Sequence, residues 1–333
     1  MRLSAIRARL AASVMTIVAG TTFAGIAGAQ EKLVLYTSQP AEQMEAVLQK
    51  FKAVNPGIEI EMFRSGTTEI MNKLQAEMAA GEPKADVLLV ADSVTMDDLK
   101  AQDMLQPYSE ADVSRLPESQ YDKDKTYFGT KLITTGIIYN TAAGKPKPTS
   151  WQDLLSEDAK GQVIMPSPLY SGAAVIHVGT MAAQPEFGWE YFEKLADNDA
   201  IAVKGNGAVR DAVARGEKAY GVIVEYMAFD QKTKGSPVDF VFPAEGVTAI
   251  NQPVGILKTA KNVAAAKKFI DYQLSDDAQK DAVTQAYFPL VKGIEPPAGY
   301  PDPAGLKIIS TDPAVLLKGT EETKKRFADL YGG

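Results

Sequence analysis

Six small clusters of polar residues recur along this sequence, each where an apolar, strand-like run gives way to a helix-like pattern. They are Thr37 with Ser38, residues 65–68, Asp92 with Ser93, residues 171–173, Asn206 with Gly207, and Glu225 with Tyr226. In open α/β sheets these positions share the edge at which ligands bind, and helix N-termini bind anions there without charged side chains. One such cluster alone is better explained by helix N-capping. Six clusters in the two halves of one chain predict a ligand-binding cleft.

The elements that would position these clusters alternate along the chain from residue 32 onward. Residues 32–36, 58–63 and 86–90 are strand-like, and residues 41–54 between the first two have helical spacing. The third run is apolar throughout, which is typical of a strand buried in a parallel sheet. A similar alternation returns between about residues 132 and 274. The pattern predicts an α/β fold with mostly parallel sheets.

Residues 1–29 have the pattern of a cleavable export signal. Arg2, Arg7 and Arg9 precede an apolar stretch, and the small residues at 27–29 fit a signal-peptidase site. We therefore expect a periplasmic protein that begins at Gln30. About 300 residues would remain, which is enough for two domains with separate cores.

Composition excludes several classes of function. The 333 residues include no cysteine and a single histidine, and the formal net charge is −7 with no cluster of Lys and Arg. Thiol chemistry and disulfides are therefore impossible, and nucleic acid is not an expected partner. The one histidine, His177, lies in an apolar stretch and is predicted to be a packed helix residue. We predict no catalytic residue, no cofactor and no enzymatic activity.

Longer stretches of the chain carry a family pattern. They are residues 33–39, 85–92, 136–140, 171–173, 206–217 and 260–272. At these residues the chain resembles the periplasmic solute-binding proteins of ABC importers, in the branch that contains binders of ferric ion, sugar phosphates and 2-aminoethylphosphonate. The resemblance implies two α/β lobes with mixed, mostly parallel sheets, joined by a hinge of crossing strands. We expect residues 30–130 and 250–290 in one lobe, and residues 131–249 and 291–333 in the other.

The ferric branch of this family holds iron with two adjacent tyrosines, a histidine and a carboxylate. Here the tyrosine pair falls on Tyr226 and Met227, and the histidine position falls on Pro40. Fe(III) is a hard ion that requires several anionic oxygens, which thioether sulfur and proline cannot supply. Asp92, Glu225 and Tyr226 alone would make a poor ferric site. We therefore predict no metal ligand.

The same branch implies an anion cradle, which this sequence retains at Ser171, Gly172, Ala173 and Asn206. Glycine allows close approach of the backbone, and the helix dipole supplies partial positive charge. The predicted ligand-binding set adds hydroxyl groups, two carboxylates and a phenol, from Ser38, Thr67, Thr68, Asp92, Glu225 and Tyr226. The carboxylates would hold an ammonium group or sugar hydroxyls, and the phenol would supply a cation–π face or a hydroxyl.

The sequence thus predicts the solute-binding component of an ABC importer, which captures a small organic phosphonate or phosphate and delivers it to a membrane permease. The first candidate is 2-aminoethylphosphonate, because two acids beside an anion site suit a zwitterion. A sugar phosphate and ferric iron remain as alternatives. The protein is expected to be a monomer.

Overall fold

The computed structural model describes residues 31–332. The predicted export signal therefore lies outside the described residues. Within them, no helix has both the length and the apolar character required to span a bilayer.

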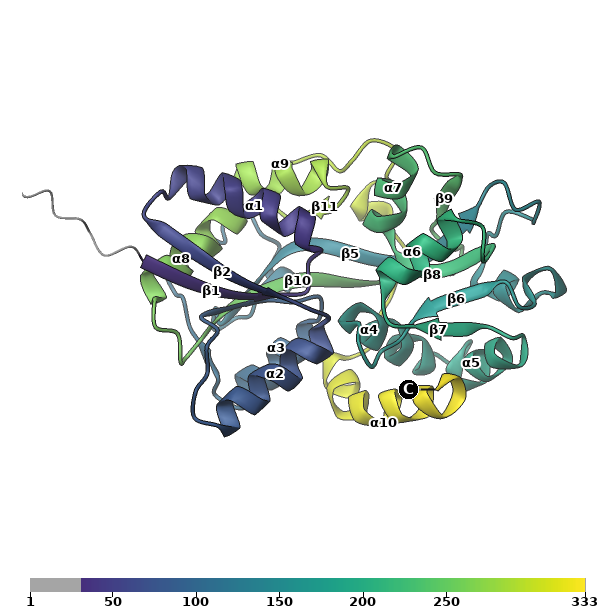
Figure 1. The fold of residues 1–333 in the computed structure, drawn as a ribbon, viewed down its shortest axis with the longest axis horizontal. Helices are drawn as coiled ribbons and strands as arrows, with labels where there is room; N and C mark the ends of the chain where they lie inside the picture. The colour runs from purple at the N-terminus through teal and green to yellow at the C-terminus, as the bar shows by residue number, and fades with distance from the viewer. Residues whose placement is uncertain (1–30, 333) are drawn as a thin grey trace, which may run out of the picture.

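The chain begins with strands and helices that lie on the left of Figure 1. They are β1 (Glu31–Thr37), α1 (Ala41–Val54), β2 (Ile58–Arg64), α2 (Thr67–Ala79), β3 (Val87–Leu89), α3 (Ser93–Ala101) and β4 (Leu105–Gln106). Two helices from late in the sequence, α8 (Val263–Gln273) and α9 (Asp276–Thr284), lie beside α1. We call this group of elements the first lobe.

A second group lies on the right of Figure 1 and is called the second lobe. It contains β6 (Val163–Pro166), α4 (Gly172–Ala182), α5 (Gly188–Asp197), β7 (Ile201–Val203), α6 (Asn206–Ala214), β8 (Tyr220–Val224), α7 (Glu225–Thr233) and β9 (Val238–Val241). The last segments are β11 (Phe288–Pro289), β12 (Ile308–Ile309) and the C-terminal helix α10 (Pro313–Tyr331). This helix contacts α4 and α5, and it also contacts α3 of the first lobe.

One sheet runs through both lobes in the order β2-β1-β3-β10-β5-β8-β6-β7. Its two ends are parallel, since β1 pairs in parallel with β2 and β3, and β6 pairs in parallel with β7 and β8. Its centre is antiparallel, and is formed by β5 (Tyr127–Asn140) and β10 (Val247–Leu257). These two long strands join the lobes (Figure 1). The predicted alternation of strands and helices is therefore confirmed.

Side chains alternate across the sheet, as the two-residue period of a strand requires. In β1, Leu33 and Leu35 pack into the core on the side of α1 and α8, whereas Tyr36 packs with residues of α2 and α3 on the other side. His177 is buried in α4 against the Trp151 ring, and its Nδ1 lies 3.0 Å from the Thr248 hydroxyl. Burial lowers the pKa of His177 to about 3, so it is a neutral core residue.

Candidate functional site: a basic cavity between the lobes

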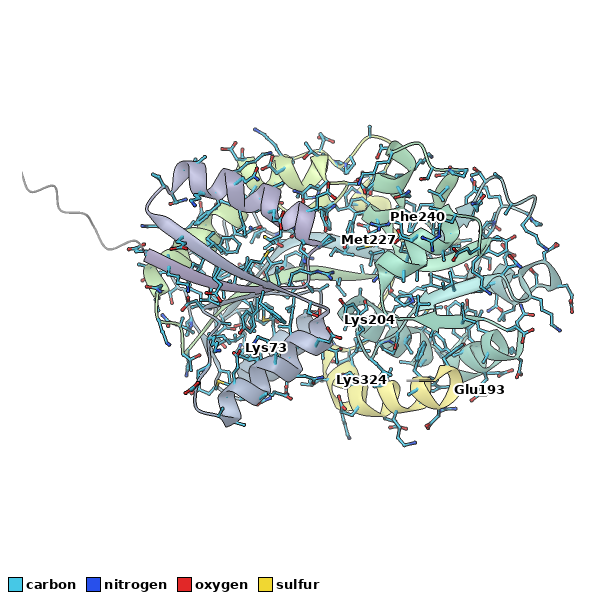
Figure 2. The ribbon with its side chains drawn as sticks, viewed as in Figure 1. Lys73, Glu193, Lys204, Met227, Phe240 and Lys324 are labelled. Atoms are coloured by element: carbon cyan, nitrogen blue, oxygen red, sulfur yellow. The ribbon has the colours of Figure 1, made fainter. Side chains whose placement is uncertain are left out.

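A cavity of about 400 Å³ lies between the two lobes. Five helices begin at its wall, namely α1 and α2 of the first lobe and α4, α6 and α7 of the second. Each of these helices follows a strand of the sheet or the loop after it, so the cavity lies at the edge where the polar clusters were expected. Two labelled residues of its wall, Lys204 and Met227, mark its position near the middle of the molecule in Figure 2.

Four of these five helices have no side-chain cap. The N-cap positions of α1, α2, α6 and α7 are Pro40, Gly66, Gly205 and Val224, and none of their side chains accepts a hydrogen bond from the helix. The first N–H groups of a helix have no partner within the helix. Because the helix dipole adds partial positive charge, the cavity wall is suited to an oxyanion.

The fifth helix, α4, begins at a close contact between the lobes. A methyl group at Gly172 would lie 2.7 Å from the Thr67 Oγ1 and 2.8 Å from the Ala91 carbonyl oxygen, so only glycine fits there. The Thr67 hydroxyl is buried at the cavity wall and has no hydrogen-bond partner among the described residues. A buried hydroxyl without a partner is costly. Its hydrogen-bonding capacity is therefore unused in this conformation.

Asn206 fixes the geometry of the second-lobe wall. Its Nδ2 donates a hydrogen bond to the Ser171 Oγ at 3.1 Å, and its Oδ1 accepts one from the Val224 N–H at 3.2 Å. The Ser171 Oγ also accepts a bond from the Ala174 N–H and so caps α4. One side chain thus connects the beginnings of three helices.

The structure brings seven of the ten predicted ligand-binding residues to the cavity wall. They are Ser38, Thr67, Ser171, Gly172, Ala173, Asn206 and Tyr226. Thr68 lies next to the cavity and connects the lobes instead, because its Oγ1 donates a hydrogen bond to the Pro168 carbonyl at 3.3 Å. The two predicted carboxylates do not line the cavity.

Asp92 caps helix α3. Its carboxylate accepts hydrogen bonds from the Val94 and Thr95 N–H groups and from the Thr95 hydroxyl. Burial raises the pKa of this carboxyl group to about 6. Capping therefore accounts for this residue without a ligand, which is the simpler interpretation of its position in the sequence.

Glu225 is fully buried behind the cavity wall. Its Oε2 accepts hydrogen bonds from the Thr134 N–H at 2.6 Å and from the Thr134 hydroxyl at 3.0 Å, while its Oε1 has no partner among the described residues. Burial raises the pKa of Glu225 to about 8, so the folded protein favours the neutral acid at neutral pH. A neutral acid is a poor partner for an ammonium group.

Three cationic residues that the sequence analysis missed line the cavity. They are Arg64, Lys204 and Arg210. Each flanks a predicted cluster, since Arg64 ends the strand before residues 65–68, and Lys204 and Arg210 lie on either side of the cluster that begins at Asn206. No Asp or Glu is among the described residues of the wall. The cavity is thus a basic region in an acidic protein.

Two of these cations also connect the lobes across the cavity. The Arg64 Nη1 donates a hydrogen bond to the Tyr170 hydroxyl at 3.2 Å, and the Lys204 Nζ pairs with the Glu69 carboxylate at 2.9 Å. The Lys204 Nζ also lies 4.8 Å from the centre of the Tyr170 ring. The described conformation is therefore one in which the lobes touch around the cavity.

Tyr226 forms part of the wall as an aromatic surface. Its ring centre lies 4.1 Å from that of Tyr287, and burial raises the pKa of Tyr226 well above the ordinary value. Met227 follows it instead of the second tyrosine of the ferric branch. Within residues 31–332, His, Asp and Glu side chains form no group of three or more that could hold a metal ion.

This fold is shared with known proteins. The sequence profile of the family described as bacterial extracellular solute-binding protein matches residues 37–280. The chain belongs to this family. It is the non-enzymatic, solute-binding component of an ABC importer in the periplasm, and the family implies a small-molecule solute and a membrane permease as partners.

Proteins with similar sequences have names that refer to different solutes. Iron uptake protein A1 of Synechocystis sp. is 28% identical, with 80% of this chain and 78% of that protein covered. A Salmonella typhimurium periplasmic protein that is provisionally named as 2-aminoethylphosphonate-binding is 26% identical, with 67% of this chain and 66% of that protein covered.

Solved structures establish the two-lobed periplasmic-binding-protein fold. The periplasmic binding protein AfuA from Actinobacillus pleuropneumoniae, with fructose-6-phosphate bound, has a TM-score of 0.82 at 22% identity, and covers 90% of this chain and 98% of its own. Iron-bound HitA from Pseudomonas aeruginosa has a TM-score of 0.76 at 22% identity, and covers 89% of this chain and 99% of its own. At this identity the likeness concerns the fold alone.

Proposed function

We propose that this protein binds a small organic phosphate or phosphonate in the cavity between its lobes and delivers it to the permease. The proposal rests on the composition of the cavity wall. Four helix N-termini without a side-chain cap and three cationic side chains line the cavity, and no acidic side chain of the described residues does. Phosphate-type anions are held by such N–H groups, hydroxyls and guanidinium groups together.

The positive charge of the cavity wall favours some candidate ligands over others. 2-Aminoethylphosphonate would place its ammonium group near Arg64, Lys204 or Arg210, and within this cavity only the ring faces of Tyr170 and Tyr226 would compensate. A phosphate ester with an uncharged body avoids this repulsion. We therefore place a sugar or polyol phosphate ahead of 2-aminoethylphosphonate, which stays a candidate because of the Salmonella relative.

Ferric iron has less support from this site. The Synechocystis relative carries an iron-uptake name. In this chain, however, Asp92 caps a helix, Glu225 is buried behind the wall and Met227 takes the place of a second tyrosine after Tyr226. A hard trivalent ion would meet cations rather than anionic oxygens.

A thermal-shift screen of the purified protein tests the proposal. The ligands are a hexose 6-phosphate, 2-aminoethylphosphonate, inorganic phosphate and Fe(III)-citrate. A ligand present at about a hundred times its Kd stabilises the folded state by about 2.7 kcal/mol, which is readily seen as a rise in Tm. We expect a rise with an organic phosphate or phosphonate. A rise with Fe(III)-citrate alone, accompanied by a red or orange colour, would overturn the proposal.

A further inference from the structure

A second cavity of about 250 Å³ opens beside the first, between α1 and α7. We call the basic cavity the inner compartment and this second cavity the outer compartment. Four residues line both compartments, namely Pro40, Arg210, Tyr226 and Met227. The two spaces therefore adjoin, and a ligand held in the inner compartment can extend past Tyr226 and Arg210 into the outer one.

The charge of the outer compartment differs from that of the inner one. Glu42 of α1 and Asp230 of α7 line it from opposite lobes, together with the cations Arg210 and Lys234. Asp230 pairs with the Lys234 Nζ at 2.8 Å, and Arg210 pairs with Asp211. Charges of both signs are thus present and largely paired, so the outer compartment favours an uncharged polar group over a second anion.

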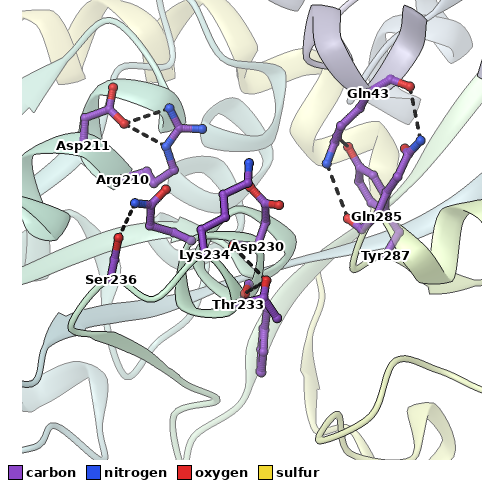
Figure 3. Close-up of polar contacts among 11 residues, drawn as sticks. Gln43, Arg210, Asp211, Asp230, Thr233, Lys234, Ser236, Gln285 and Tyr287 are labelled. Carbon is purple, nitrogen blue, oxygen red and sulfur yellow. Dashed lines mark hydrogen bonds and ion pairs between the residues drawn. The ribbon is translucent and has the colours of Figure 1, made fainter. Parts of the chain in front are cut away.

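One wall of the outer compartment is held rigid by paired amides. The Gln285 Nε2 donates to the Gln43 carbonyl oxygen at 3.2 Å, and the Gln43 Nε2 donates to the Gln285 carbonyl oxygen at 3.4 Å. The Tyr287 hydroxyl donates to the Gln43 Oε1 at 2.7 Å. Figure 3 shows this group on one side, with Arg210, Asp230 and Lys234 on the other. Polar groups fixed in this way can recognise a ligand at low entropic cost.

We propose that the outer compartment is a second subsite, which receives the hydroxyl-rich body of a phosphate ester whose anionic group lies in the inner compartment. Carboxylates accept hydrogen bonds from hydroxyl groups, and a guanidinium group donates to them. The inner compartment alone is already more than ten times larger than the roughly 30 Å³ that a water molecule occupies in the liquid. This inference rests on the proposed function. It implies that Glu42, Arg210 and Asp230 determine which phosphate esters the protein binds.

The test introduces a large side chain into the outer compartment and leaves the residues of the inner compartment unchanged. Ala46 lies one turn after Glu42 on α1, lines the outer compartment and is exposed. Ala53 is an exposed alanine further along the same helix and lines neither compartment, so Ala53→Trp is a matched control for Ala46→Trp. Calorimetric titration of both variants and of the unchanged protein uses a hexose 6-phosphate and inorganic phosphate. We expect Ala46→Trp to weaken hexose 6-phosphate binding about tenfold or more, with inorganic phosphate unaffected and Ala53→Trp neutral for both.

The outcomes separate this inference from the proposed function. Equal losses for both ligands in Ala46→Trp, or no loss for either, would overturn the second subsite while phosphate binding stands. Tight binding of 2-aminoethylphosphonate together with no binding of the hexose phosphate would do the same. If the unchanged protein binds none of these phosphates and phosphonates, the proposed function itself is wrong.

Discussion

Gly172 lies at a close contact between the two lobes, beside the unpartnered hydroxyl of Thr67. Its lack of a side chain matters only when the lobes touch, because the atoms that a methyl group would meet include Thr67 and Ala91 of the first lobe. A substitution there should therefore separate ligand binding from folding.

We predict that Gly172→Ala lowers affinity for the phosphate ligand at least about tenfold, which corresponds to about 1.4 kcal/mol. The added methyl group would lie 2.7 Å from the Thr67 Oγ1 and hold the lobes apart. The Tm of the ligand-free protein should stay the same or rise slightly, because alanine is favoured over glycine in a helix. Gly319→Ala in α10, where the methyl group meets nothing within 4 Å, is the control. Unchanged affinity in Gly172→Ala would contradict the closed geometry.

Glu225 gives a prediction for pH. Its pKa is raised from 4.5 to about 8 by burial, so between these values the folded protein keeps a proton that the unfolded chain releases. The contribution of Glu225 to the free energy of unfolding therefore falls as pH rises from about 4.5 to about 8, with a slope of up to about 1.4 kcal/mol per pH unit. The neighbouring Tyr226, Tyr287 and Tyr300 stay neutral throughout, since burial raises the pKa of each.

The variant Glu225→Gln removes this titration and keeps an oxygen for the Thr134 N–H. Chemical denaturation at several pH values should show a shallower decline for the variant between pH 5 and pH 8. The difference between the two proteins isolates Glu225 from the other buried groups that titrate in or near this range, namely Asp92, Lys131 and His177. Parallel curves would show that Glu225 is ionised in the folded protein.

At the scale of elements, the sequence could predict where helices start but not which side chains face the cavity. A polar residue after an apolar strand marks both a cap and a binding edge. Ser171 has both roles, because it caps α4 and lines the cavity, whereas Asp92 caps α3 and is not part of the cavity wall. Arg64 and Lys204 were missed because their positions at the cavity depend on how the lobes approach each other, and that approach has no local sequence signal.

The beginning of α6 allows a test of the charge preference of the cavity. We predict that Asn206→Asp lowers phosphate affinity more than about tenfold, because it places a carboxylate at the cavity wall. Its Oδ1 can still accept from the Val224 N–H, and an acid at a helix N-terminus is favourable, but the bond that Asn206 Nδ2 donates to Ser171 is lost, so Tm should fall slightly. Titration calorimetry and thermal unfolding measure the two effects. A gain in affinity for Fe(III)-citrate in this variant, with none lost for phosphate, would favour a cation site.

At the scale of the whole molecule, β5 and β10 join the lobes while a few side chains connect them across the cavity. The pair between Lys204 and Glu69 is one of these, and both side chains are largely exposed. An exposed ion pair contributes about 0–1 kcal/mol, so this pair alone cannot hold the lobes together. Closure therefore depends on the ligand and on the other contacts between the lobes, such as the Arg64–Tyr170 hydrogen bond, and Lys204 should act mainly through its charge at the cavity wall.

Two variants distinguish these roles of Lys204. Glu69→Gln removes the cross-lobe pair and leaves the cation at the wall, so we predict less than about a fivefold loss of phosphate affinity, which corresponds to about 1 kcal/mol. Lys204→Ala also removes the charge that faces the ligand, and its loss should be larger and should shrink as salt is raised. Titration calorimetry at two ionic strengths measures both, with Lys325→Ala on the outer face of α10 as the control. Equal losses in the two variants would mean that Lys204 serves closure alone, and that the anion is held by the helix N-termini and the remaining arginines.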